Sequence, residues 1–94
     1  MKLKLYSSTG KVDPNLVSLQ ADDLDFLPTV LVCPLREDAP ETIVRSRVLF
    51  QGKIYTAMCE LARPIRRSAL REVGALEENA SQEIMRKFVR VQAR

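Results

Sequence analysis

The stretch LVSLQADDLDFLPTVLVCPL, residues 16–35, decides how the rest of the chain is arranged. Its most apolar run, Thr29–Cys33, lies between two prolines. Because this run is too short for a helix and is rich in β-branched residues, it predicts a buried strand. A shorter strand is predicted at Leu16–Leu19, and an acidic turn at residues 22–25 connects the two. We therefore expect two strands in the middle of a small sheet, on which the other elements pack.

Three further segments have the pattern of strands. We expect an edge strand at residues 2–6, a strand at residues 42–50 and a returning strand at residues 53–61. Gln51 and Gly52 supply the turn between the last two, since glycine readily adopts the positive φ of tight hairpin turns. Alternation places Tyr55, Ala57, Cys59 and Leu61 on one face of the returning strand and Ile54, Thr56, Met58 and Glu60 on the other.

The C-terminal third predicts a short helical turn and then one clear helix. The turn is expected at residues 66–71, with Gly74 as its stop. Asn79 is a typical N-cap, and Gln82 completes a capping box. Apolar residues then recur at helical spacing, namely Ala80, Ile84, Phe88 and Val91. The sequence predicts a mainly β protein, a small SH3-like curled barrel with a C-terminal helix, as a single domain over residues 1–94.

Composition excludes several kinds of site. The chain has no histidine, the commonest general base and zinc ligand. The acidic turn at residues 22–25 lacks the ligand pattern of a calcium loop, so we expect no metal and no cofactor. Cys33 and Cys59 are expected to be buried thiols, and a disulfide is possible only if their strands are neighbours. No apolar run approaches the roughly 20 residues that span a bilayer, and the alternating N-terminus is not a signal peptide, so the cytoplasm is the expected location.

Positive charge is concentrated late in the sequence. The net charge is +3, with −1 on residues 1–61 and +4 on residues 62–94. A basic C-terminal segment of this kind could bind nucleic acid or an acidic protein segment. The other interpretation is that these charges form an ordinary solvated surface. Arg45 and Arg47 alternate on one face of a predicted strand, about 7 Å apart, with Arg36 near the same end of the sheet. These guanidinium groups could clamp phosphates or carboxylates, or could simply pair with nearby glutamates.

Two parts of the sequence resemble known bacterial toxins. The pattern LVxLQADxLDxLPTxxVxPL over residues 16–35 is similar to the early part of the CcdB toxins. The pattern RPIRRxxLxxVGxL over residues 63–76 is similar to the segment before the terminal helix of the related MazF toxins, which include Kid and PemK. The resemblance implies the CcdB/MazF-like fold and a homodimeric toxin of a type II toxin–antitoxin system. It also implies an antitoxin with an acidic, disordered C-terminal segment.

Two targets divide these toxins. CcdB-type members poison DNA gyrase, and MazF-type members cut single-stranded RNA without a metal. The ribonuclease pattern has an arginine after the first strand and a Ser or Thr after a Cys-Pro-Ile strand. Here Arg36 follows the Cys-Pro-Leu of residues 33–35, and no arginine precedes it. The resemblance therefore favours the gyrase branch, a topoisomerase inhibitor that is not an enzyme, although the tryptophan of the gyrase contact is absent and only the helix position carries over.

We thus expect the exposed side of the C-terminal helix to bind gyrase, through Arg86, Lys87, Arg90, Val91 and Arg94. The alternative is a metal-independent endoribonuclease that cuts single-stranded RNA with Arg36, Arg45 and Arg47. Cleavage needs a base for the 2′-hydroxyl and an acid for the leaving oxygen, and Glu60 is a further candidate for that work. A third hypothesis is an inactive or adaptor barrel.

Overall fold

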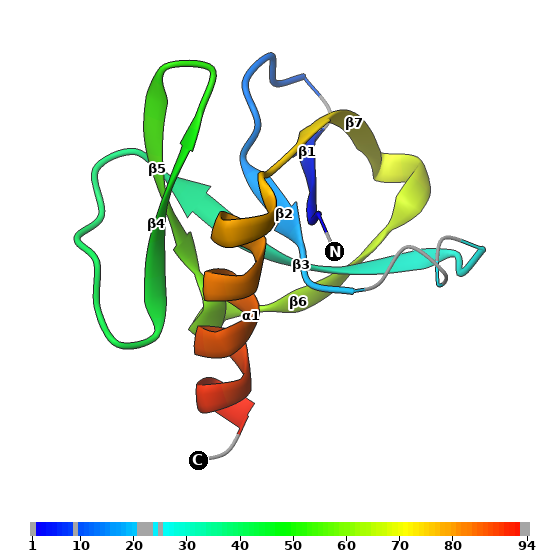
Figure 1. The fold of residues 1–94 in the computed structure, drawn as a ribbon. Coiled ribbons are helices and arrows are strands. Elements are labelled where there is room, and N and C mark those ends of the chain that lie inside the picture. Colours follow the sequence, from blue (N-terminus) through cyan, green and yellow to red (C-terminus); the bar gives the residue numbers. More distant parts are fainter. Residues whose placement is uncertain (1, 9, 21–23, 25, 93–94) are drawn as a thin grey trace.

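The computed structural model describes residues 2–8, 10–20, 24 and 26–92. It contains a curled antiparallel sheet and one long helix (Figure 1). The strands are β1 (Lys4–Ser8), β2 (Leu16–Ser18), β3 (Thr29–Arg36), β4 (Arg45–Phe50), β5 (Lys53–Met58), β6 (Arg63–Arg66) and β7 (Leu70–Ala75). Two short 3₁₀ turns, η2 (Cys59–Leu61) and η3 (Arg67–Ala69), and the helix α1 (Glu78–Gln92) complete the fold.

Strand β3 organises the sheet, as the apolar run within residues 16–35 predicts. The strand order is β4-β5-β3-β2-β1-β7, and β6 also pairs with β3. One end of β3 pairs with β6 from Thr29 to Val32, its middle pairs with β2, and Leu35 and Arg36 pair with β5. Because one eight-residue strand serves three partners, the sheet must curl around it. The predicted small curled barrel with a terminal helix is confirmed. Of the acidic turn, Asp22, Asp23 and Asp25 lie outside the described residues.

The first strand is not an edge strand, contrary to the sequence prediction. β1 lies between β2 and β7 and pairs with both. The error arose because residues 66–71 were predicted as a helical turn, whereas only η3 is helical and β6 and β7 flank it. Pro64 lies inside β6. An edge strand tolerates a proline, and β6 pairs only with β3.

Two other predicted strands are shorter than expected. The strand predicted at residues 42–50 begins at Arg45, because residues 42–45 form a tight turn closed by backbone hydrogen bonds between Thr42 and Arg45. The returning strand ends at Met58, where the chain turns into η2. Leu61, which alternation placed on the same face as Tyr55, Ala57 and Cys59, is therefore exposed, whereas those three residues are buried. The turn at Gln51 and Gly52 is confirmed, and both residues have positive φ.

Helix α1 closes one side of the barrel and runs beside β4 (Figure 1). It begins at Glu78, one residue before the predicted cap Asn79. Ile84 and Phe88 are buried in the core, as their spacing predicts. Ser81 is also buried, and its Oγ accepts a hydrogen bond from the backbone N–H of Leu3 at 2.8 Å. In the described part of the chain, no helix is long and apolar enough to cross a membrane.

The two cysteines are free and fully buried, so the expectation of buried thiols is confirmed and no disulfide is present. The antiparallel pairing of β3 with β5 brings the neighbouring parts of the chain together, and a hydrogen bond joins the two thiols. A hydrogen bond with Cys59, followed by burial, raises the pKa of the Cys33 thiol above its usual range. Cys33 therefore stays a protonated, unreactive thiol in the native core.

Replacing Gly74 by alanine should destabilise the fold by about 1–3 kcal/mol. Gly74 lies in β7 beneath the ring of Phe50, and a Cβ there would come within 2.6 Å of the ring's Cζ. Urea unfolding measures the change. In a Phe50→Leu background the same substitution should lower the free energy of unfolding by clearly less, because the opposing ring is gone. Equal costs in both backgrounds would contradict this packing.

Candidate functional site

The three arginines of the ribonuclease hypothesis lie on one face of the sheet. Arg36 of β3 and Arg47 of β4 both pair with Thr56 of β5, so the three residues form a cross-strand row. Arg45 lies two residues before Arg47 and shares its face, since alternate residues of a strand point the same way. Arg36 and Arg47 are exposed and Arg45 is half-buried. The register of three strands thus gathers cations that are separated in sequence.

The centre of this row is covered. Thr56 is 1% exposed, and its Oγ1 donates a hydrogen bond to the carbonyl oxygen of Ala39 at 2.6 Å. The loop after β3 therefore crosses the face between Arg36 and Arg47. The next cross-strand pair, Leu49 and Ile54, is well exposed and gives the outer end of this surface an apolar character.

Glu60 completes the surface. It lies in η2, where the turn brings its carboxylate back to β4, and its Oε2 accepts a hydrogen bond from Arg45 Nε at 2.6 Å. Both side chains keep about a quarter of their surface exposed, 27% for Arg45 and 25% for Glu60. Among the described residues, Glu60 Oε1 is buried and has no hydrogen-bond partner. A buried polar atom without a partner is costly, so the Glu60 carboxylate keeps unused hydrogen-bonding capacity beside Arg45.

We call Arg36, Arg45, Arg47 and Glu60 the arginine face. Guanidinium groups bind phosphate oxygens and always carry charge, and a carboxylate can accept a proton. Together these groups can hold a phosphodiester and deprotonate a hydroxyl beside it. Within the ranges that the structure describes, no group of three or more Cys, Asp or Glu residues could hold a metal ion.

The residues predicted to bind gyrase do not form one exposed surface. Arg86 and Arg90 are exposed on α1, and Arg86 donates to Glu83 one turn earlier. Val91 is half-buried and packs on the core. Arg94 lies outside the described residues.

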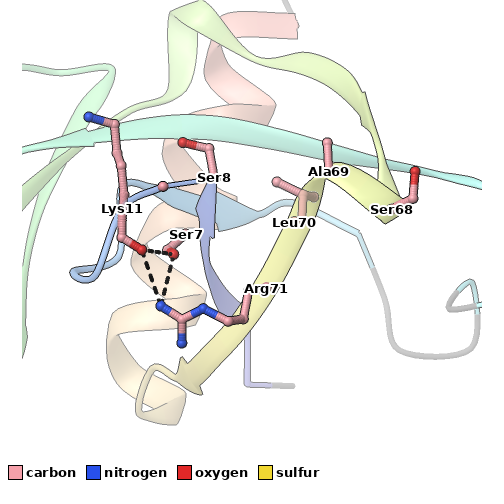
Figure 2. Close-up of a pocket in the computed structure, with 8 residues that line it drawn as sticks. Ser7, Ser8, Lys11, Ser68, Ala69, Leu70 and Arg71 are labelled. Atoms are coloured by element: carbon pink, nitrogen blue, oxygen red, sulfur yellow. Dashed lines mark hydrogen bonds between the residues drawn. The ribbon is translucent and has the colours of Figure 1, made fainter.

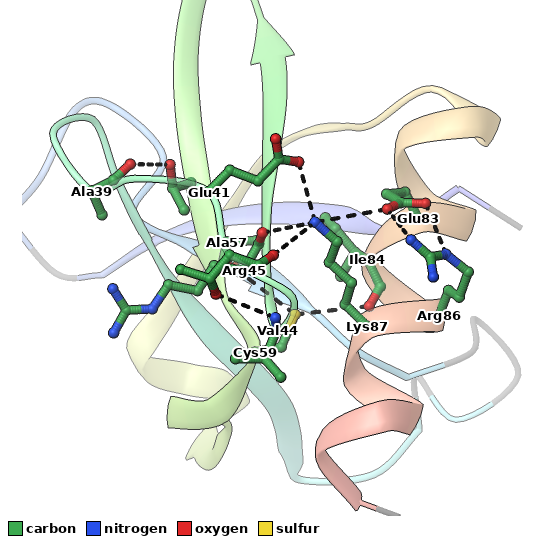
Figure 3. Close-up of polar contacts among 12 residues, drawn as sticks. Ala39, Glu41, Val44, Arg45, Ala57, Cys59, Glu83, Ile84, Arg86 and Lys87 are labelled. Carbon is green, nitrogen blue, oxygen red and sulfur yellow. Dashed lines mark hydrogen bonds and ion pairs between the residues drawn. The ribbon is translucent and has the colours of Figure 1, made fainter.

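Lys87, predicted to be exposed, is 6% exposed. Its Nζ donates to the carbonyl oxygens of Arg45 at 2.9 Å and Thr42 at 3.0 Å, and to Glu41 Oε2 at 3.1 Å (Figure 3). A fourth oxygen, Glu83 Oε1, lies 3.7 Å away. The sequence prediction failed here because helical periodicity cannot anticipate that the turn at residues 42–45 covers this side of the helix.

A groove lies between that turn and α1, with a volume of about 410 Å³. Its walls are Glu41, Thr42, Ile43, Arg86, Lys87 and Arg90. Ile43 is exposed at its rim. The groove therefore joins two exposed arginines to an exposed aliphatic residue.

Sequence reasoning missed a second groove, of about 330 Å³, beside the end of β3. It is lined by Lys11, Val12, Asp13, Pro14, Asn15, Leu35, Glu37 and Tyr55. Asp13 forms an ion pair with Lys53 of β5 at 3.1 Å. Burial, together with the charge of Asp13, raises the pKa of Tyr55. The polar loop between the first two strands was the only signal in the sequence for this groove.

A third hollow, of about 280 Å³, lies where the ends of β1 and β7 meet (Figure 2). Arg71 dominates it, but its guanidinium already donates to Ser7 Oγ and to the carbonyl oxygens of Lys11 and Val12. Arg71 therefore fixes the loop after β1 (Figure 2).

The ion pair of Glu41 gives a pH prediction. A hydrogen bond from Lys87 holds the pKa of Glu41 below its usual value. Because the pKa of Glu41 is lower in the folded state than in the unfolded state, the ion pair stabilises the fold fully above the unfolded pKa of about 4.3. This stabilisation is lost as the pH falls through the pKa of Glu41 in the folded state. Glu41→Gln should therefore be less stable than wild type at pH 7, and the difference should shrink toward pH 3 in urea titrations. A difference that grows on acidification would contradict the ion pair.

The sequence and the structure were compared with those of known proteins. No protein-family model and no curated protein matches the sequence. Among solved structures, the Mycobacterium tuberculosis toxin MazF-mt6 is similar, with a TM-score of 0.73 and 14% identity over 99% of this chain and 97% of that chain. A second solved structure, that of an Mtb toxin, has the same TM-score and identity over 97% of this chain and 99% of that chain. The chain therefore shares the fold of these two toxin structures over nearly its whole length.

Proposed function

We propose that this protein is the toxin of a type II toxin–antitoxin system and acts as a metal-independent endoribonuclease on single-stranded RNA. One observation carries the proposal: a carboxylate with an unpartnered oxygen, Glu60, is hydrogen-bonded to Arg45 on a surface that also bears Arg36 and Arg47. The similarity in fold to a MazF toxin supports it.

The proposed reaction uses groups of this chain together with one water molecule. Arg36 and Arg47 bind backbone phosphates, and Arg45 keeps the Glu60 carboxylate in place. The carboxylate accepts the proton of a ribose 2′-hydroxyl, and the 2′-oxygen forms a bond to the adjacent phosphorus. The bond from phosphorus to the 5′-oxygen breaks, and that oxygen takes a proton from water. The products are a 2′,3′-cyclic phosphate and a 5′-hydroxyl end.

The gyrase hypothesis has weaker support. Two of its five contact residues are withdrawn from the surface, since Lys87 is buried and Val91 packs on the core. The similar structures reported above are MazF-type and Mtb toxins. We therefore prefer the ribonuclease alternative. A homodimer, and an antitoxin with an acidic segment that fits the basic surface, remain parts of the proposal.

The test uses purified protein with two substrates. Single-stranded RNA in EDTA should be cut, and supercoiled plasmid with gyrase should give no linear DNA. Intact RNA together with linear plasmid would restore the gyrase hypothesis. Intact RNA and intact plasmid, with harmless overexpression in bacteria, would favour the inactive or adaptor barrel.

A further inference from the structure

Lys87 is the one lysine of α1, and it reaches out of the helix into the turn that precedes β4 (Figure 3). Two of its three hydrogen bonds go to backbone carbonyl oxygens, those of Thr42 and Arg45, and the third goes to Glu41. These two carbonyls belong to the residues that close the turn, because Thr42 and Arg45 also exchange backbone hydrogen bonds of 3.2 and 3.3 Å. The ammonium group therefore fixes both ends of the turn at once.

The same backbone carries the arginine face. Arg45 contacts Lys87 through its carbonyl oxygen and Glu60 through its side chain. A shift of the Arg45 backbone would move the guanidinium and change its hydrogen bond to Glu60. Lys87 does not reach the substrate surface itself, because its Nζ is enclosed by Glu41, Thr42, Arg45 and Glu83.

We propose that Lys87 is a positioning residue that couples α1 to the Arg45–Glu60 pair. This inference rests on the proposed ribonuclease function for its kinetic consequence, but its structural part can be measured without RNA. A buried ammonium bound to two carbonyls and a carboxylate is a costly arrangement unless all its partners stay in place, so removing it should loosen the turn. The position of α1 would then determine whether the Arg45–Glu60 pair is formed.

The first readout is the Arg45 Nε–H signal in ¹⁵N-labelled protein, assigned by its loss in Arg45→Lys. In wild type this proton should be protected from exchange by its bond to Glu60. In Lys87→Met the signal should shift and exchange faster, whereas the charge-matched control Arg63→Met, at an exposed position of β6, should leave it unchanged. If Lys87→Met does not fold, Lys87→Gln keeps hydrogen-bond donors and serves in its place.

The second readout is RNA cleavage. A displacement of catalytic groups by up to 1 Å can lower the reaction rate by roughly 100-fold. We therefore expect kcat to fall by roughly 10- to 100-fold in Lys87→Met. KM should change little, since Arg36 and Arg47 are untouched. Lys87→Arg, which keeps the charge and donors, should recover part of kcat.

The outcomes separate the two proposals. A shifted Arg45 signal without any RNA cleavage by wild type would support the coupling and refute the ribonuclease. A folded Lys87→Met protein with an unchanged Arg45 signal would overturn the coupling, whatever the enzyme does. The coupling would also be wrong if Lys87→Met raised KM alone, because that would place Lys87 at the RNA surface.

Discussion

Glu60→Gln is expected to reduce RNA cleavage by roughly 10²- to 10⁴-fold, the usual contribution of a general base. Glutamine has nearly the same shape, and its side-chain oxygen can still accept the hydrogen bond that Arg45 Nε gives to Glu60 Oε2 at 2.6 Å. The arginines should therefore stay in place and RNA binding should remain close to that of wild type. Single-turnover cleavage and an equilibrium binding assay measure the two quantities.

Glu72→Gln is the matched control for this prediction. Glu72 is an exposed carboxylate of β7, near Lys4 at 3.6 Å and outside the arginine face. Its variant should cleave RNA at the wild-type rate. If Glu60→Gln kept full activity, another group would have to take the 2′-hydroxyl proton. If it lost activity and RNA binding together, Glu60 would have a structural role.

Ile84→Ala should destabilise the fold by about 2–5 kcal/mol. Ile84 is the most deeply buried apolar residue of α1, at 0% exposed, and packs in the core with residues of the sheet. Removing its branched side chain loses apolar burial and leaves a cavity that neighbours on several strands cannot all fill. The midpoint of urea unfolding, at unchanged slope, measures the loss.

Val89→Ala on the same helix is the control for Ile84. Val89 is 57% exposed, so its truncation should change stability by no more than about 0.5 kcal/mol. A small effect at Ile84, or equal effects at both positions, would mean that α1 does not pack on the barrel as described.

The sequence predicted the parts of the fold that depend on local pattern. The apolar run of β3, the glycine turn at Gly52 and the four-residue spacing of Ile84 and Phe88 each have one dominant physical cause. Each prediction is confirmed. β6 and β7 were missed because their residues are mostly exposed and carry several arginines, so no alternation of apolar residues marks them. Their strand conformation comes from pairing with β3 and β1, which is a tertiary effect.

The candidate site was predictable only in part. The residue types of Arg36, Arg45 and Arg47 drew attention in the sequence, and alternation placed two of them on one face. Arg36 lies in the same cross-strand row as Arg47 because both residues pair with Thr56. That arrangement depends on the register of β3, β5 and β4, which the sequence does not specify. The burial of Lys87 depends on the turn that packs over α1. The grooves, too, arise from elements that lie far apart in sequence.

The most direct test of the proposed function compares two oligonucleotides of the same sequence in EDTA, one of RNA and one with 2′-deoxyribose throughout. We predict that the protein cuts only the RNA, leaving 2′,3′-cyclic phosphate and 5′-hydroxyl ends that mass spectrometry identifies, since the 2′-hydroxyl is the attacking group. Cleavage of both oligonucleotides, or RNA that stays intact over a range of sequences, would contradict the proposal.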